Sequence, residues 1–460
     1  MTKSMTKTLT NREEEATEPT EHCDALVIGA NLGGLTISYL LACWGYSVRT
    51  IERAPFIGGI DRSFRNRNGR IFDFGVHSLD YMRSGYTTRL MMQAIDNQVI
   101  KMERKRGIVL RSCVIPYNAD KSEWPAELAA MLPEGELVDE LGTARPTRQN
   151  LARYYGEEFT DFIFDETLAS YPADSRHLAF GVEEWELMKN IYPWFFPRAR
   201  RTPAEINASR IFHDKARGGQ REDLMYPVEG GFGSFADGFA RKIEERGGEI
   251  VTGASDLHVA FDPIEGHVRY VEAKGRRFEA PRVYWCAPPE TLGELLSAPC
   301  PQVNSETFVL GSFEFERPLQ CEYTELLVGD PEHFISRASF PGKFSRTADN
   351  LVQLEFAYPR QLDRHEAKES YWLEKWVASL QRLGIVQPGN AVVDFDLKVV
   401  PMMYNSYGID GVPTPDVNFG DVLPKTSNLR PVLPTVRKVN INTRLPQYLE
   451  FLTADLLGQP

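Results

Sequence analysis

The chain contains 460 residues, 42% of them hydrophobic and 25% charged, an ordinary globular composition with enough length for two or three domains. Its 52 lysines and arginines against 64 aspartates and glutamates give a net charge of -12, which argues against a nucleic-acid-binding protein with a basic surface. No run of about 18 apolar residues is present, so we predict no membrane-spanning helix.

The first segment, residues 1–22, is polar and has no apolar run, so we predict a disordered tail and not a signal peptide. The six cysteines are scattered and form no CxxC pair, which is typical of reduced thiols and gives no zinc site. Together these features predict a cytoplasmic protein without a bound metal.

Residues 24–52 read, in order, as a strand, a glycine turn, a helix, a second strand and an acid. The apolar run 25–28 predicts a buried strand, and Gly29 begins the turn, after which apolar residues keep one helical face (Leu32, Leu35, Leu40 and Leu41). Residues 47–51 predict the second strand, and Glu52 ends it near the usual distance for an acid that binds ribose hydroxyls. This order is typical of a dinucleotide-binding βαβ unit, whose helix N-terminus favours a pyrophosphate.

The turn departs from the usual pattern at one position, where it reads Gly29, Ala30, Asn31, Leu32, Gly33, Gly34. The usual residue at position 31 is a glycine, which lets the backbone approach the phosphates closely. Asparagine tolerates positive φ better than most residues, but its side chain takes up room. Two interpretations therefore stay open: a nucleotide-binding unit, and a degenerate Rossmann unit.

Further motifs follow the acid: a Gly-Gly pair at residues 58–59, RIFDFGVH at 70–77, VIPYN at 114–118 and YPVEGGFG at 226–233. In this order the chain resembles the amine-oxidase-like FAD flavoprotein superfamily, which includes protoporphyrinogen oxidases and UDP-galactopyranose mutases. VIPYN is similar to a hairpin of the mutase branch. The resemblance implies that FAD is bound by the turn, the acid and the two following segments, at Gly29, Asn31, Gly33, Gly34, Glu52, Arg53, Gly58, Gly59, Gly75 and Val76.

The resemblance also implies the fold class, an α/β protein whose Rossmann-like FAD-binding domain is interleaved with a second α+β substrate domain. We expect the FAD-binding domain to comprise residues 23–95, 226–300 and 396–455. The substrate domain, residues 96–225 and 301–395, would combine a helical insert with an antiparallel sheet. Runs that alternate or are apolar predict three strands of that sheet at residues 312–315, 351–358 and 392–400.

The C-terminal block is a second departure from the superfamily. Its members usually end with a strand, a Gly-Arg pair and a helix that points at the flavin, whereas Leu433-Pro434 stands in the place of Gly-Arg here. Pro434 removes an amide and fixes φ, so any flavin contact of this backbone must differ from the usual one. Residues 446–457 predict the helix.

Three side chains are candidates for chemistry. His77 belongs to the segment that in the relatives lies against the flavin ring, where an imidazole could donate a hydrogen bond or shuttle a proton; a structural histidine is the alternative. Asp73, in the same segment, is more simply a turn acid that caps local amides. Tyr404 and Tyr407 lie where mutase relatives place tyrosines that contact the substrate, and the alternative is a strand end with two half-exposed aromatic residues.

These features predict an FAD-dependent oxidoreductase that transfers a hydride from a small-molecule substrate to flavin. In this interpretation His77 and Tyr404 orient the substrate or protonate it. One alternative is a UDP-galactopyranose mutase-like sugar isomerase, favoured by VIPYN and Tyr404. Another is a cofactor-deficient homologue that serves as the partner subunit of an active enzyme, favoured by Asn31 and Leu433-Pro434. We expect no nucleic-acid partner, and a homo- or hetero-oligomer stays open.

Overall fold

The structure is a computed structural model that describes residues 20–75, 78–80, 85–116, 125–131, 152, 156–162, 223–297, 303–358, 365–407, 423–424, 427–432 and 441–457. The chain divides into two compact units, each built from separate stretches of sequence. Unit 1 comprises Met1–Ile57, Ala240–Ala298 and Asn418–Leu433, and unit 2 comprises Gly58–Phe239, Pro299–Val417 and Pro434–Pro460. By this division, four stretches that we expected in the FAD-binding domain belong to unit 2: residues 58–95, 226–239, 396–417 and 434–455.

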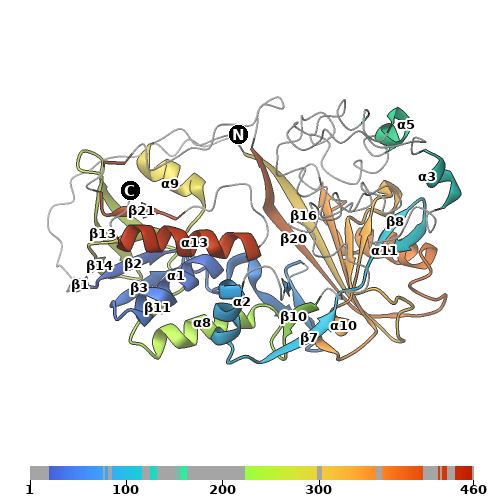
Figure 1. Cartoon of the computed structure of the whole chain (residues 1–460), viewed down its shortest axis with the longest axis horizontal. Coiled ribbons are helices and arrows are strands. Elements are labelled where there is room, and N and C mark those ends of the chain that lie inside the picture. The colour runs from blue at the N-terminus through green and yellow to red at the C-terminus, as the bar shows by residue number, and fades with distance from the viewer. Residues whose placement is uncertain are drawn as a thin grey trace, which may run out of the picture. The chain divides into compact units, whose positions relative to one another are not determined.

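Unit 1 is built on a five-stranded, all-parallel sheet (Figure 1). Its strands in spatial order are β11 (Glu249–Val251), β3 (Val48–Ile51), β2 (Ala25–Ile28), β15 (Val283–Trp285) and β21 (Leu429–Pro431). All four residues of β2 are buried, as is expected of a parallel strand covered on both faces. The predicted α/β class with a parallel, Rossmann-like sheet is confirmed.

Helix α1 (Leu32–Cys43) connects β2 to β3 and is buried along nearly its whole length. The buried hydroxyls of Thr36 and Ser38 have partners, because Thr36 Oγ1 donates to the Leu32 carbonyl at 2.7 Å and Ser38 Oγ lies 2.8 Å from Thr50 Oγ1 of β3. The helix is therefore fixed against the sheet by polar as well as apolar contacts. Unit 1 also contains α9 (Pro289–Leu296) and a sheet with the order β1 (Glu21–His22), β14 (Arg276–Glu279), β13 (His267–Ala273), β12 (His258–Asp262).

Two features of the chain termini differ from the expected segments. Glu21 and His22 lie within the predicted tail but form β1, which pairs with β14 in parallel; the rest of the predicted tail, residues 1–19, lies outside the described residues. At the other end α13 (Ile441–Leu456) begins before Pro446, the residue at which we expected it to start. Pro446 is the sixth residue of this helix, beyond the four N-terminal amides that lack partners within a helix, so its ring removes one hydrogen bond of the helix.

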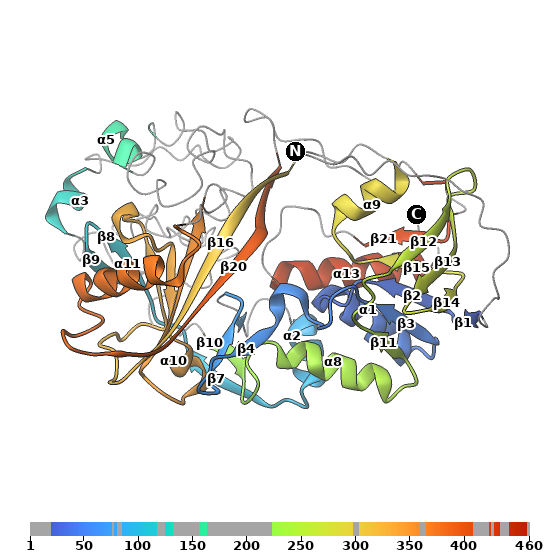
Figure 2. The same cartoon turned by 180° about the vertical axis from the view of Figure 1, so that it is seen from behind.

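Unit 2 is built on a seven-stranded sheet (Figure 2). Its strands in spatial order are β20 (Val392–Tyr407), β16 (Val303–Phe315), β19 (Leu351–Tyr358), β18 (Arg337–Ser339), β17 (Glu325–Val328), β8 (Arg106–Leu110) and β9 (Cys113–Pro116). Every neighbouring pair is antiparallel except β17 and β8. The three strands predicted for an antiparallel sheet are present as β16, β19 and β20.

The two faces of this sheet bury different kinds of side chain. One carries the apolar core of the unit, where Trp372 and Trp376 of α11 (Glu369–Arg382) are fully buried beside Phe313. The other carries a smaller apolar cluster that includes Phe308, together with buried polar side chains, among them Gln353 and Glu314. Since buried polar groups need partners, this second face requires a polar segment packed against it.

The remaining elements of unit 2 are short strands and helices: β4 (Ser63–Arg65), β5 (Ile71–Asp73), β6 (Leu79–Asp80), β7 (Val99–Glu103), β10 (Asp223–Pro227), η1 (Gly59–Asp61), η10 (Pro331–His333), α2 (Gly85–Ala94), α3 (Ala126–Ala130), α5 (Glu157–Asp161) and α10 (Pro341–Ser345). Helix α8 (Ser234–Glu244) continues from unit 2 into unit 1. Most of the predicted helical insert lies outside the described residues. Among the helices that the structure describes, none has the length and apolar character needed to cross a bilayer.

Candidate functional site

The turn between β2 and α1 requires two of its glycines. Gly29 has φ +101°, and a Cβ there would lie 2.9 Å from the Ala287 amide nitrogen. A Cβ on Gly34 would lie 2.0 Å from the Gly29 carbonyl oxygen. Only glycine fits both positions, so the first and last glycines of the motif are explained by backbone packing.

Asn31 is the N-cap of α1, and its backbone is extended at φ -68° and ψ 173°. The position therefore needs no residue that tolerates positive φ. Its side-chain Oδ1 accepts a hydrogen bond from the Gly34 amide at 3.0 Å, as an N-cap asparagine commonly does. Its Nδ2 donates to the Cys286 carbonyl at 2.6 Å.

The hydrogen bond from Asn31 to Cys286 connects the ends of two neighbouring strands of the sheet. Cys286 follows β15, and β15 and β3 lie on opposite sides of β2. The chain leaves β2 towards β3, so the carboxyl ends of β2 and β15 flank a topological switch point, where open α/β sheets bind ligands. The Asn31 amide thus forms a hydrogen bond across this switch point, from the turn after β2 to the residue after β15.

Glu52 follows β3, and its carboxylate lies over the same turn. Oε2 accepts a hydrogen bond from the Ala30 amide at 2.7 Å, and Oε1 accepts one from the Ala54 amide at 2.8 Å. A carboxylate oxygen has two lone pairs, so each oxygen can accept a further hydrogen bond from a ribose hydroxyl. The next residue, Arg53, is exposed.

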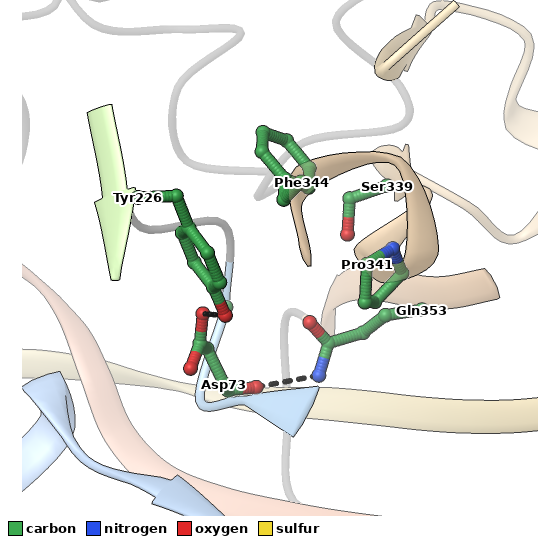
Figure 3. Close-up of a pocket in the computed structure, with 7 residues that line it drawn as sticks. Asp73, Tyr226, Ser339, Pro341, Phe344 and Gln353 are labelled. Atoms are coloured by element: carbon green, nitrogen blue, oxygen red, sulfur yellow. Dashed lines mark hydrogen bonds between the residues drawn. The ribbon is translucent and has the colours of Figure 1, made fainter. Parts of the chain in front are cut away.

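In unit 2, Asp73 at the end of β5 is the centre of a buried hydrogen-bond network (Figure 3). Its Oδ1 accepts from Ser63 Oγ at 2.5 Å and from the Phe232 amide at 2.9 Å, and its Oδ2 accepts from the Tyr226 hydroxyl at 2.7 Å. Gln353 Nε2 donates to the Asp73 carbonyl at 2.5 Å. The carboxylate therefore joins β5 to the YPVEGGFG block, and the carbonyl joins it to the large sheet.

In this network Asp73 and Tyr226 are both buried and satisfy each other by a hydrogen bond. Burial, followed by the charge of Asp73, raises the pKa of Tyr226 well above its ordinary value, so the hydroxyl stays a proton donor to the carboxylate. The simpler interpretation of Asp73, a turn acid that caps local amides, does not fit this arrangement, because the amide that donates to its carboxylate belongs to Phe232, 159 residues away. A pocket beside the network is lined by Asp73, Gly75, Tyr226, Ser339, Pro341, Phe344 and Gln353 (Figure 3).

The hairpin β4–β5 is fixed to the polar face of the large sheet by Glu314. Its Oε2 accepts from Asn66 Nδ2 and Asn68 Nδ2, and its Oε1 accepts from Arg70 Nε, each at 3.0 Å. Gly75, with φ +109°, follows directly after this anchored hairpin. The position of residues 72–75 (FDFG) is thus set by the hydrogen bonds of Glu314 and by those of Asp73.

The other predicted site residues are described to different extents. Gly58 and Gly59 precede and begin η1 with φ +88° and +59°. The backbone of Tyr404 and Tyr407 belongs to β20, where Tyr407 pairs with Val303. Val76, His77, Leu433 and Pro434 lie outside the described residues. The hairpin predicted around VIPYN is present as β8 and β9.

Comparisons with known proteins agree with this geometry. The family model for an NAD(P)-binding Rossmann-like domain matches residues 27–94. The chloroplastic prolycopene isomerase of Daucus carota is 25% identical over 281 residues, which cover 54% of this chain and 43% of that relative. The chain therefore matches less than half the length of that relative.

Solved structures match over nearly the whole chain. Reduced UDP-galactopyranose mutase has a TM-score of 0.65 at 14% identity, with 95% of this chain and 94% of that chain covered. A putrescine oxidase mutant from a redesign of cofactor binding has a TM-score of 0.62 at 15% identity, with 96% and 100% covered.

The parallel sheet, the glycine turn and the acid after β3 are the features of a Rossmann-like unit, in agreement with the family model that matches residues 27–94. Over nearly its whole length the chain shares its fold with the solved UDP-galactopyranose mutase and putrescine oxidase structures, as the predicted resemblance implied.

Proposed function

We propose that this chain is an FAD-dependent oxidoreductase that acts on a small molecule by hydride transfer to flavin. The observation that carries the proposal is the position of Glu52, whose carboxylate accepts from the amide of Ala30 in the glycine turn. An acid at this place is positioned for the ribose of an adenine dinucleotide. The likeness to flavoproteins supports FAD as that dinucleotide.

The residues of the turn fit a dinucleotide. Amides in the first turn of a helix have no acceptor within the helix, so those of Leu32 and Gly33 are suited to phosphate oxygens. Asn31 satisfies the Gly34 amide itself. An asparagine amide carries two hydrogens, so the bond to Cys286 leaves a second hydrogen that could be donated to a phosphate.

Bound FAD would supply the two-electron acceptor of the reaction. In our proposal Gly33, Arg53, Gly58, Gly59, Gly75 and Val76 contribute to the same binding site. His77 would hold or donate a proton on its imidazole beside the substrate, and Tyr404 and Tyr407 would contact the substrate. The bonds of Asp73 and Glu314 would then position the segment that leads to His77.

The proposal is tested by titrating flavin-free protein with FAD and following flavin fluorescence. We expect the native chain to bind with a micromolar or lower Kd. Replacing Glu52 with alanine removes charged hydrogen bonds worth about 1.5–3 kcal/mol, so the affinity should fall about 10- to 100-fold. Glu265→Ala, at an exposed glutamate of unit 1, is the matched control and should leave the Kd unchanged. No binding by the native chain, or equal binding by Glu52→Ala, would contradict the proposal.

A second candidate function is a sugar isomerase of the UDP-galactopyranose mutase type. It is favoured by the structural match to that mutase and by the β8–β9 hairpin at VIPYN. Incubating dithionite-reduced protein with a panel of nucleotide sugars separates it from the oxidoreductase, because an isomerase converts its substrate without net consumption of electrons.

A third candidate is a cofactor-deficient partner subunit. It is favoured by Asn31, whose side chain uses one helix N-terminal amide and joins both sides of the switch point. Replacing Asn31 with glycine tests it: a large gain in FAD affinity would show that the native side chain obstructs the phosphates. An unchanged or lower affinity would count against this candidate.

A further inference from the structure

A second group of functional side chains lies in unit 2, in the short turn at residues 330–333 that contains η10. Nε2 of His333 lies 3.7 Å from Asp330 Oδ2 and 3.8 Å from Glu332 Oε1, and the three atoms all lie within 4.8 Å of one another. His333 is fully buried and Asp330 is buried, whereas the side chain of Glu332 is 59% exposed. One side of the cluster is therefore open to solvent.

The distances from His333 do not fit hydrogen bonds. Both carboxylate oxygens lie beyond hydrogen-bond range of Nε2, and Ser112 Oγ lies at the limit, 3.5 Å away. The other ring nitrogen, Nδ1, is buried and has no hydrogen-bond partner among the described residues. The polar contacts of this buried ring are therefore made through Nε2 and are long, which leaves room for an ion between Nε2 and the two acids.

These distances leave room for a metal ion. Two ligand atoms that each lie about 2.1 Å from a tetrahedral zinc-like ion are about 3.4 Å apart. The observed separations of 3.7 and 3.8 Å are a few tenths of an ångström longer, so a small side-chain movement would bring the ligand atoms onto the ion. One imidazole and two carboxylates form a ligand set suited to Zn²⁺ or Mn²⁺, with at least one further position for water.

The surroundings hold the ligands in place. Asp330 accepts hydrogen bonds from the amides of Arg111 and Ser112 at 2.6 and 2.5 Å, which fixes its carboxylate over the β8–β9 turn. Ser112 Oγ also lies 3.4 Å from Glu332 Oε1. The cation beside the cluster, Arg382, donates to the Glu332 carbonyl at 3.3 Å and to Ser379 Oγ at 3.1 Å.

The charges of the cluster favour a cation. Two carboxylates and one guanidinium leave one negative charge when the imidazole is neutral.

We propose that Asp330 Oδ2, Glu332 Oε1 and His333 Nε2 form a binding site for a divalent transition-metal ion of the zinc or manganese type. The site shares no residue with the proposed FAD site. A bound ion would connect the β8–β9 turn, through Asp330, to α11, whose Ser379 donates to the His333 carbonyl at 3.1 Å. Its role would be structural, since it joins one edge of the large sheet to the helix.

The test uses the full-length, untagged chain with Cys43→Ser and Cys113→Ser, because both thiols are exposed and could themselves bind zinc. Calorimetric titrations with ZnCl₂ and with MnCl₂ should show one equivalent bound and a raised melting temperature for at least one ion. Glu332→Gln should weaken that binding at least tenfold. This variant removes an exposed carboxylate, so the fold should be kept.

Glu322→Gln is the matched control, since Glu322 has a 70% exposed side chain and an ion pair with Lys105 at 3.7 Å. Its affinity for the metal should equal that of the parent chain. The proposal is overturned if neither metal binds stoichiometrically, or if Glu332→Gln and Glu322→Gln bind equally well. Neither result would affect the proposed FAD binding, which is measured separately.

Discussion

The side chain of Asn31 makes two hydrogen bonds that can be removed one at a time. Asn31→Ala removes the helix cap on Gly34, worth about 1 kcal/mol, and the bond to Cys286, worth about another 1 kcal/mol. The free energy of unfolding should therefore fall by about 2 kcal/mol. Asn31→Ser keeps an oxygen that can cap the helix but lacks the amide donor, so its loss should be about 1 kcal/mol.

The assay is urea unfolding of the flavin-free protein, followed by circular dichroism, with the native chain and both variants measured together. Hydrogen exchange of the peptide that contains α1 would show whether the loss is local to this helix. A loss below about 0.5 kcal/mol for Asn31→Ala, or equal losses for the serine and alanine variants, would refute the assignment of two separate hydrogen bonds at this residue.

Three other perturbations test the framework around the site. Gly34→Ala places a Cβ 2.0 Å from the Gly29 carbonyl oxygen, so little folded protein should be recovered, as judged by soluble yield and circular dichroism; a normal yield would contradict the packing. Tyr226→Phe leaves the buried Asp73 carboxylate without one donor and should lower the free energy of urea unfolding by about 1–3 kcal/mol, whereas an unchanged value would show that the bond is weak. Burial raises the pKa of Glu314, but hydrogen bonds from Asn68, Asn66 and Arg70 leave it below its ordinary 4.5. The contribution of this carboxylate to the free energy of unfolding should therefore be complete above pH 4.5 and lost as the pH falls through the lowered pKa. In Glu314→Gln the free energy of unfolding should depend less on pH below 4.5, and an equally steep dependence would count against the assignment.

The fold of unit 1 could be predicted from local sequence because its signals are local. The apolar run 25–28, the glycine turn and Glu52 lie within one βαβ unit, and the structure places them as predicted. The antiparallel strands β16, β19 and β20 were likewise indicated by their own residues, although β20 extends beyond the predicted range.

The contacts that position the site were less predictable, because they join distant residues. Asp73 binds Tyr226 and Gln353, which are 153 and 280 residues away, and periodicity carries no information about such pairs. The same holds for the bond from Asn31 to Cys286. The side chain of Asn31 was expected to occupy space near the phosphates, but the sequence did not indicate that it also caps α1.

The site at residues 330–333 gave no recognisable motif. Its three residues are nearly consecutive, which does not match the spacing of common metal motifs. Only burial of His333 and the folding of the turn over the β8–β9 hairpin bring the three ligand atoms together. Such a site can be inferred from coordinates but not from spacing.

The central proposal is that unit 1 binds FAD at the turn between β2 and α1. The most direct measurement is the absorption spectrum of freshly purified protein from the near ultraviolet to the blue, repeated after incubation with excess FAD and removal of unbound ligand. We predict the two bands of an oxidised flavin and about one FAD released per chain on heat denaturation. A spectrum without flavin bands after that incubation would contradict the proposal.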